Sequence, residues 1–75
     1  MKELVEYIAK SLVDHPDQVT VNEVEGRSGT VLELTVADSD MGRVIGKGGR
    51  VVNAIRTLVK VSAANTGTRY SLEIV

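Results

Sequence analysis

The 75-residue chain contains no cysteine, no tryptophan and no phenylalanine, and it has a single proline. Without cysteine, neither disulfide bonds nor thiolate chemistry can support the fold, so we expect a protein of the reducing cytoplasm. No stretch reaches the ~18 consecutive apolar residues of a membrane-spanning helix, and the first residues lack the apolar run of a secretion signal. The sequence therefore predicts a cytoplasmic protein without a membrane partner.

Aromatic residues are also scarce, and Tyr7 and Tyr70 are the only two. Many nucleic-acid-binding sheets and barrels stack bases on exposed aromatic rings. Both tyrosines fall on hydrophobic patterns that predict the core or its edge. We therefore expect no aromatic stacking platform on this protein.

Groups suited to catalysis are few. His15 is the single histidine, it precedes Pro16, and the pattern gives it no acid–base partner. Asp38 and Asp40 are spaced as helix-capping residues, and no spacing indicates a zinc or calcium site. The sequence predicts a protein that is not an enzyme and that has neither a metal nor a cofactor.

Charge is divided unequally along the chain. Residues 1–40 carry three cationic and nine acidic side chains, whereas residues 41–75 carry six cationic side chains and one acidic side chain. The net charge of −1 therefore conceals an acidic half of −6 and a basic half of +5. A protein of this kind can bind a polyanion on one side only.

The hydrophobic pattern predicts six elements in the order helix, strand, strand, helix, helix, strand. They cover residues 2–14, 18–25, 30–37, 41–45, 50–64 and 69–75. The glycine-rich turn at 26–29 predicts an antiparallel hairpin, and a right-handed crossover through two helices makes strands 30–37 and 69–75 parallel neighbours. The fold class is α+β, with three helices on one face of a three-stranded mixed sheet, in a single domain spanning residues 1–75. The other face is expected to be open to water and to carry Glu33, Thr35, Ser71 and Glu73.

The most informative segment covers residues 42–50 and reads GRVIGKGGR. Glycines let a backbone approach a ligand closely. We expect free N–H groups at Gly48, Gly49 and Arg50, where a helix starts and its partial positive charge favours an anion. Lys47 supplies a mobile cation, and arginines lie on both sides. A tight turn needs glycine but not three cations, so the segment predicts contact with phosphate.

Two well-known nucleotide-binding loops do not fit this segment. A P-loop has four residues between its first two glycines, whereas only three residues separate Gly42 from Gly46. A P-loop also has a serine or threonine at the position that Gly48 occupies in this chain. The dinucleotide fingerprint fails as well, because Val51 occupies the place of its third glycine.

The run Val44-Ile45-Gly46-Lys47-Gly48-Gly49 resembles the Ile-Gly-x-x-Gly signature of KH domains. In that family the loop joins two helices and clamps about four single-stranded nucleotides by their backbone. The order of elements resembles the type II, or bacterial, KH fold. The match spans essentially the whole chain, and the opening helix, the turn at 14–16 and the run at 40–50 together resemble the KhpA family of small bacterial single-KH proteins.

The resemblance implies an RNA-binding surface formed by the loop and the residues on either side of it: Arg43, Val44, Ile45, Gly46, Lys47, Gly48, Gly49, Arg50, Asn53 and Arg56. The glycines and Lys47 would meet the RNA backbone. Val44 and Ile45 would help to form the apolar floor of a groove, although burial of Ile45 in the core is an equal alternative. Arg43, Arg50, Asn53 and Arg56 would reach phosphates or base edges, with a simple solvated helix face as the alternative for Asn53 and Arg56.

We therefore expect a single-stranded RNA-binding protein that uses its GxxG loop as a clamp and acts as a bacterial post-transcriptional regulator or RNA chaperone. The resemblance also implies a homodimer or a complex with a larger KH-containing protein. The alternative function is a protein-interaction module that docks such a partner, with RNA contact secondary.

Overall fold

A computed structural model describes all residues, 1–75. Its elements are helix α1 (Lys2–Leu12), strand β1 (Thr20–Gly26), strand β2 (Gly29–Thr35), helix α2 (Met41–Ile45), helix α3 (Arg50–Ala64) and strand β3 (Tyr70–Ile74). Single turns of 3-10 helix, η1 (Pro16–Gln18), η2 (Asp38–Asp40) and η3 (Lys47–Gly49), lie in the connections. The six predicted elements are confirmed, and α3 has the predicted bounds.

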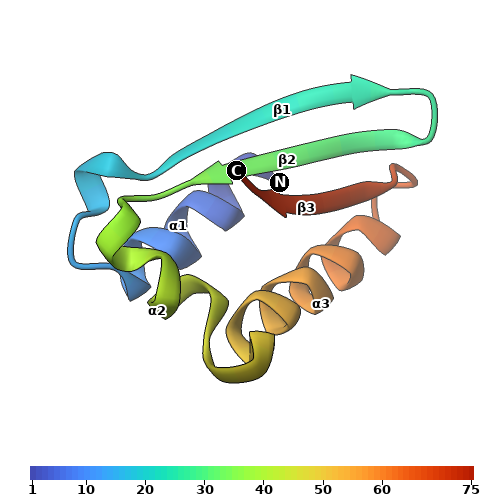
Figure 1. Cartoon of the computed structure of the whole chain (residues 1–75). Coiled ribbons are helices and arrows are strands. Elements are labelled where there is room, and N and C mark those ends of the chain that lie inside the picture. The colour runs from blue at the N-terminus through green and yellow to red at the C-terminus, as the bar shows by residue number, and fades with distance from the viewer.

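The three strands form one mixed sheet in the order β1-β2-β3. β1 and β2 are antiparallel, with Thr20 opposite Thr35, whereas β2 and β3 are parallel, with Leu32 opposite Leu72. All three helices cover one face of this sheet, and no element covers the other (Figure 1). The predicted mixed sheet and its parallel pair are therefore confirmed, and β3 lies at an edge.

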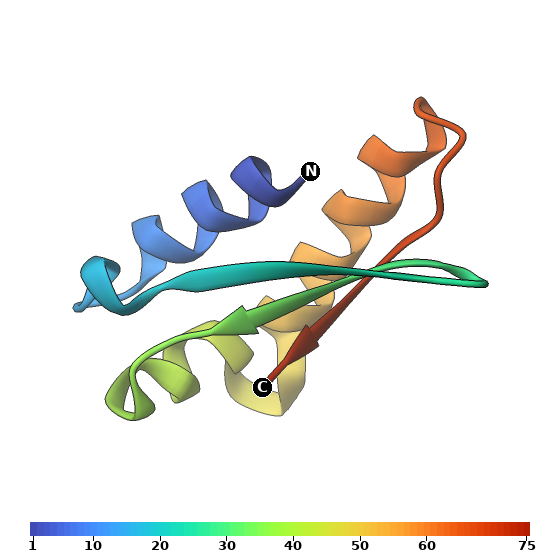
Figure 2. The same cartoon turned by 90° about the horizontal axis from the view of Figure 1, so that it is seen from above.

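The core lies between the sheet and the helices, and it is built from aliphatic side chains alone. Its twelve buried members are Val5, Ala9, Val19, Val21, Leu32, Leu34, Val36, Val44, Val52, Ile55, Val59 and Leu72. Strand residues reach it by alternation and helix residues by the helical repeat. Seen from above, β3 starts beside the C-terminal end of α3 and runs back toward the N-terminal end of α3 (Figure 2). A strip between α3 and the sheet edge therefore leads to the 46–49 loop.

A buried aspartate corrects two expectations of the sequence. Asp40 is 1% exposed and occupies the N-cap position of α2, yet its side chain makes no capping bond. Its carboxylate instead accepts hydrogen bonds from the backbone N–H groups of Asp14 (3.1 Å) and His15 (3.0 Å). These bonds hold the segment after α1 in extended geometry, so α1 ends at Leu12 rather than near Asp14.

None of the three helices has the length and the apolar character that a membrane-spanning helix needs.

Candidate nucleic-acid interface

The loop Gly46–Gly49 joins α2 to α3 and lies at the end of the helical layer away from the sheet (Figure 1). Gly46, Gly48 and Gly49 have φ angles of 75°, 64° and 80°, in the region that favours glycine. A Cβ at Gly46 would lie 2.5 Å from the Val51 side chain, whereas a Cβ at Gly48 would meet nothing within 4 Å. Gly46 is thus needed for close packing, and Gly48 faces open space.

The backbone of this loop is more fully bonded than its sequence predicts. The N–H of Gly49 donates to the carbonyl of Gly46 (3.1 Å), and the N–H of Arg50 donates to the carbonyl of Lys47. The expectation of free N–H groups at Gly49 and Arg50 is therefore wrong. The loop closes into a 3-10 turn because its positive φ angles bring these donors back onto the preceding carbonyls.

Three exposed cations surround the loop. Arg43 lies in α2, Lys47 lies in the loop itself, and Arg50 begins α3. Arg43 Nη2 lies 3.3 Å from Asp14 Oδ2, and both side chains are more than half exposed. Lys47 and Arg50 form no ion pair with a carboxylate. Two of the three cations are thus free for an anionic ligand, and the third is shared with Asp14.

The two apolar residues before the loop have different environments. The Val44 side chain is fully buried in the core, so it supports the loop from beneath and presents no surface to a ligand. Ile45 is 39% exposed, which places it at the surface next to Gly46 and not in the core. Of this pair, only Ile45 can form part of an apolar floor.

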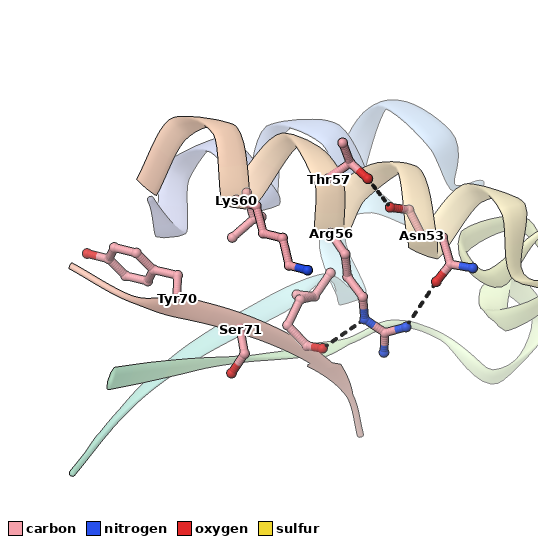
Figure 3. A pocket seen from close by; sticks show the side chains of 8 residues that line it. Asn53, Arg56, Thr57, Lys60, Tyr70 and Ser71 are labelled. Atoms are coloured by element: carbon pink, nitrogen blue, oxygen red, sulfur yellow. Dashed lines mark hydrogen bonds between the residues drawn. The ribbon is translucent and has the colours of Figure 1, made fainter. Parts of the chain in front are cut away.

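A groove lies between α3 and β3, and its lining residue Asn53 is next to the loop, since a Cβ at Gly49 would lie 3.6 Å from Asn53 Nδ2. The groove has a volume of about 350 Å³ and is lined by Asn53, Arg56, Thr57, Val59, Lys60, Tyr70, Ser71 and Leu72. Figure 3 shows Arg56 and Lys60 reaching from α3 toward β3, where Tyr70 lies beside the hollow and the Ser71 side chain points away from α3. The helix contributes two cations, and the wall contributed by β3 has none. The groove therefore brings together the two α3 residues expected from the sequence, Asn53 and Arg56.

Arg56 spans the groove from one wall to the other. Its Nε donates to the carbonyl of Leu72 in β3 (3.2 Å), and its Nη1 donates to Asn53 Oδ1 (3.3 Å) (Figure 3). These two bonds hold the guanidinium in a defined position. Arg56 is an exposed residue of α3, and its side chain is bonded to the sheet edge.

A second hollow, of about 540 Å³, adjoins the groove along the C-terminal part of α3 and the turn that follows it. Lys60, Tyr70 and Ser71 line both hollows, and Arg69 adds a further cation at this end. Sequence reasoning missed the contribution of β3. The predicted parallel pairing of strands 30–37 and 69–75 could have indicated this contribution, because it puts β3 at the sheet edge beside α3.

The two tyrosines behave differently. Tyr70 is half-buried against the core, as its pattern predicts, but it also lines both hollows. Tyr7 is 73% exposed, so the expectation that Tyr7 lies in the core or at its edge is wrong. The α1 pattern buries Val5 and Ala9 and turns the intervening Tyr7 outward. No group of three or more His, Cys, Asp or Glu side chains is arranged to hold a metal ion.

The order of elements, the mixed sheet and a GxxG loop between two helices define a KH domain. Comparison with known proteins agrees, since the family model described as "KhpA/KhpB, KH domain" matches residues 2–74. The chain belongs to this KhpA/KhpB family of KH domains.

Similar proteins are found across several bacteria. The chain is 55% identical to the RNA-binding protein KhpA of Clostridium acetobutylicum, 56% identical to that of Clostridium perfringens and 55% identical to that of Caldanaerobacter subterraneus. Each alignment covers all of this chain and all of the relative. No solved structure gives a significant match.

Proposed function

We propose that this protein binds single-stranded RNA, with the loop Gly46–Gly49 clamping the RNA backbone and the groove between α3 and β3 receiving the bases. The observation that carries the proposal is that the two parts are adjacent. Asn53, which lines the groove together with Arg56 and Lys60, lies next to the loop, because a Cβ at Gly49 would lie 3.6 Å from Asn53 Nδ2. The full-length relatives named RNA-binding proteins support the same function.

The dimensions of this surface fit a short RNA segment. From Arg50 to Lys60 the helix α3 advances about 15 Å, at ~1.5 Å per residue. That length suits the roughly four nucleotides that a KH loop and groove hold. One short groove with few cations gives weak binding, which we expect in the micromolar range at physiological salt, in keeping with its dependence on few phosphate contacts.

The test is a double substitution in the loop, Lys47→Asp with Gly48→Asp. It places two carboxylates on the phosphate path, where repulsion and the loss of a charge-assisted contact weaken RNA binding by about tenfold or more. The fold should survive, because Gly48 has open space around it and aspartate tolerates its φ of 64° better than most residues. Binding is measured by titration of a short single-stranded RNA, and folding by circular dichroism and thermal melting.

The chain supplies a matched control in its other Gly-x-x-Gly segment, residues 26–29. Arg27→Asp with Ser28→Asp introduces the same two carboxylates and the same change in charge, at exposed positions of the β1–β2 turn. This control should bind RNA nearly as the parent does. A folded loop variant that binds as tightly as the control would show that residues 46–49 are not the clamp.

In the cell, we propose a cytoplasmic role as a post-transcriptional regulator or RNA chaperone. Crosslinking in living cells, followed by sequencing of the attached RNA, tests this role and identifies the targets. Recovery of a protein partner without RNA would instead favour the second candidate function, a module that docks another KH protein.

We also propose that the chain associates with a second copy, and one observation favours this. Leu58 and Val61 on α3 are 50% and 62% exposed and are helical neighbours. The helical repeat puts them on a side of α3 away from Arg56 and Lys60, so pairing there leaves the groove open. Two grooves on one RNA then gain avidity.

Sedimentation of the parent and of Leu58→Glu with Val61→Glu tests the association. The parent should sediment as a dimer at high concentration, and the variant as a monomer. Val75→Glu changes an apolar residue that is 55% exposed elsewhere and serves as the control. A parent that stays monomeric at all concentrations would remove the proposal.

A further inference from the structure

Arg56 differs from the other cations near the groove because it is fixed before any ligand arrives. Its Nε donates to the Leu72 carbonyl, and its Nη1 donates to Asn53 Oδ1. Arg69 and Val75 share backbone hydrogen bonds with β2, so by strand alternation the groups of Leu72 point to the free edge of β3. Arg56 therefore occupies an acceptor on the sheet edge that would otherwise be open.

The position of Arg56 separates it from the phosphate path. It lies in the groove, six residues beyond Arg50 and thus about 9 Å farther along α3 from the loop. Phosphate contact in the loop uses mobile, solvated cations such as Lys47, which need no fixed plane. A guanidinium held in one plane across the groove is suited instead to a planar ligand.

The bonds that Arg56 makes also limit what it can accept. A guanidinium has five N–H donors and no acceptor. Two of these donors are used, which leaves both N–H groups of Nη2 and one of Nη1 for a ligand. Such a group recognises two acceptors lying side by side, as in the bidentate pairing of arginine with guanine O6 and N7.

We propose that Arg56 is a specificity-determining residue that selects, within the groove, a base with two adjacent hydrogen-bond acceptors. The proposal rests on the proposed RNA-binding function and deepens it. Guanine meets the requirement through O6 and N7, and cytosine meets it through O2 and N3. Adenine does not meet the requirement, because its amino group, a donor, lies beside the ring acceptor on both the Watson–Crick and the Hoogsteen edge. Uracil does not meet it either, because an N–H lies between its two carbonyl acceptors. The groove therefore prefers guanine or cytosine to adenine or uracil.

The experiment uses four RNA octamers of equal charge: oligouridine, and oligouridine with a single central guanosine, cytidine or adenosine. For the parent chain, the guanosine or the cytidine octamer should bind about 5- to 150-fold more tightly than oligouridine, the range of one good bidentate pair. The adenosine octamer should bind like oligouridine. Replacing guanosine by 7-deazaguanosine removes N7 and shows whether a guanosine preference depends on both acceptors.

Arg56→Lys keeps the charge and loses the planar fork. This variant should lose the preference while its affinity for oligouridine stays within about threefold of the parent, because phosphate contacts are unchanged. Arg50→Ala, beside the loop, should instead weaken all four octamers by a similar factor. Arg27→Lys, in the distant hairpin turn, should change nothing. Thermal melting of each variant confirms folding.

Each contrary result has a distinct meaning. Equal binding of all four octamers by the parent, or an unchanged preference in a folded Arg56→Lys variant, overturns the assignment of Arg56 while RNA binding by the loop still stands. A uniform loss of affinity for all four octamers in Arg56→Lys would identify Arg56 as a phosphate contact, and this result also overturns the assignment of Arg56 as a specificity-determining residue. A parent that binds none of the octamers contradicts the proposed function itself, and the proposal for Arg56 fails with it.

Discussion

The chain contains the pattern Gly-x-x-Gly twice, at residues 26–29 and 46–49, and the two segments have different structural roles. The first closes the β1–β2 hairpin, with Gly26 paired to Gly29. The second connects two helices and closes into a 3-10 turn. The same four-residue pattern therefore serves a strand turn in one place and a helix connection in the other, and the flanking elements decide which.

The charge around the two segments differs as well. Glu23 and Glu25 precede the hairpin turn, where Arg27 is the single cation. The second segment lies in the basic half of the chain and is next to Asn53, which lines the groove beside α3. Glycine spacing alone thus identifies a turn. The helices on both sides, the local cations and the adjoining groove are what make residues 46–49 a candidate clamp.

The largest expected effects concern one glycine in each segment. A Cβ at Gly29 would lie 2.3 Å from the Arg69 carbonyl oxygen, and one at Gly46 would lie 2.8 Å from the Val51 nitrogen. Both residues also have positive φ. Gly29→Ala and Gly46→Ala should each lower the free energy of unfolding by about 2–5 kcal/mol, combining backbone strain with a steric clash. Urea denaturation measures this.

Two of the three remaining glycines in these segments, Gly48 and Gly26, provide the controls. Gly48→Ala has open space but a left-handed backbone, so it should cost about 1–2 kcal/mol. Gly26 lacks positive φ, and a Cβ there is in ordinary contact, so Gly26→Ala should stay within about 0.5 kcal/mol. If Gly46→Ala proves no more destabilising than Gly48→Ala, close packing against Val51 is not the reason for glycine at position 46.

The next prediction compares the hairpin turn at 26–29, which is stabilised by residues close in sequence, with the loop at 46–49, which is stabilised by residues distant in sequence. The hairpin turn is closed by its own strands. In contrast, Asp40 directly precedes α2, which leads into the second segment, and Asp40 accepts hydrogen bonds from the backbone of Asp14 and His15. Asp40→Ala leaves two partly buried N–H groups without their acceptor and should cost about 2–4 kcal/mol. Asp40→Asn keeps one acceptor oxygen and should cost less.

Asp38→Ala is the matched control, because Asp38 is exposed and its side chain makes no hydrogen bond. It should change stability by no more than about 0.5 kcal/mol. Hydrogen exchange gives a second measurement, since the amides of Asp14 and His15 should lose protection in Asp40→Ala while those of the hairpin keep theirs. Equal stability of the two alanine variants would contradict the role of Asp40 as a tether.

These contrasts show what the sequence can and cannot predict. Alternation and helical repeat predicted all six elements, and the two-helix crossover predicted the parallel pair, because these features are periodic and local. The burial of Asp40 was not predictable, since it depends on contact with Asp14, 26 residues away. The groove wall formed by β3 depends in the same way on packing between elements that are distant from the glycine loop in sequence.

A smaller effect tests which segment attracts RNA electrostatically. If Arg43, Lys47 and Arg50 contact three phosphates of a single strand, about two counterions are released, and log K should fall with log salt with a slope of about −2. Affinity should then drop about 15- to 20-fold between 50 and 200 mM salt. Removing Lys47 by Lys47→Gln should reduce the slope by about 0.7, whereas Arg27→Gln in the hairpin turn should leave it unchanged. A nanomolar affinity that does not change with salt concentration would contradict this model.

The smallest effect concerns the ion pair beside the loop. Arg43 Nη2 lies 3.3 Å from Asp14 Oδ2, and both groups are exposed, so the pair stabilises the fold by at most about 1 kcal/mol. An RNA phosphate must compete with Asp14 for Arg43. Asp14→Asn removes the competitor and should raise the affinity for a short RNA about two- to threefold, an effect within the range of one exposed pair. Glu25→Gln, beside the other Gly-x-x-Gly segment, makes the same change in net charge and should raise affinity less. Equal gains from the two substitutions would mean that only net charge matters, and Arg43 would then lose its place among the residues that contact RNA.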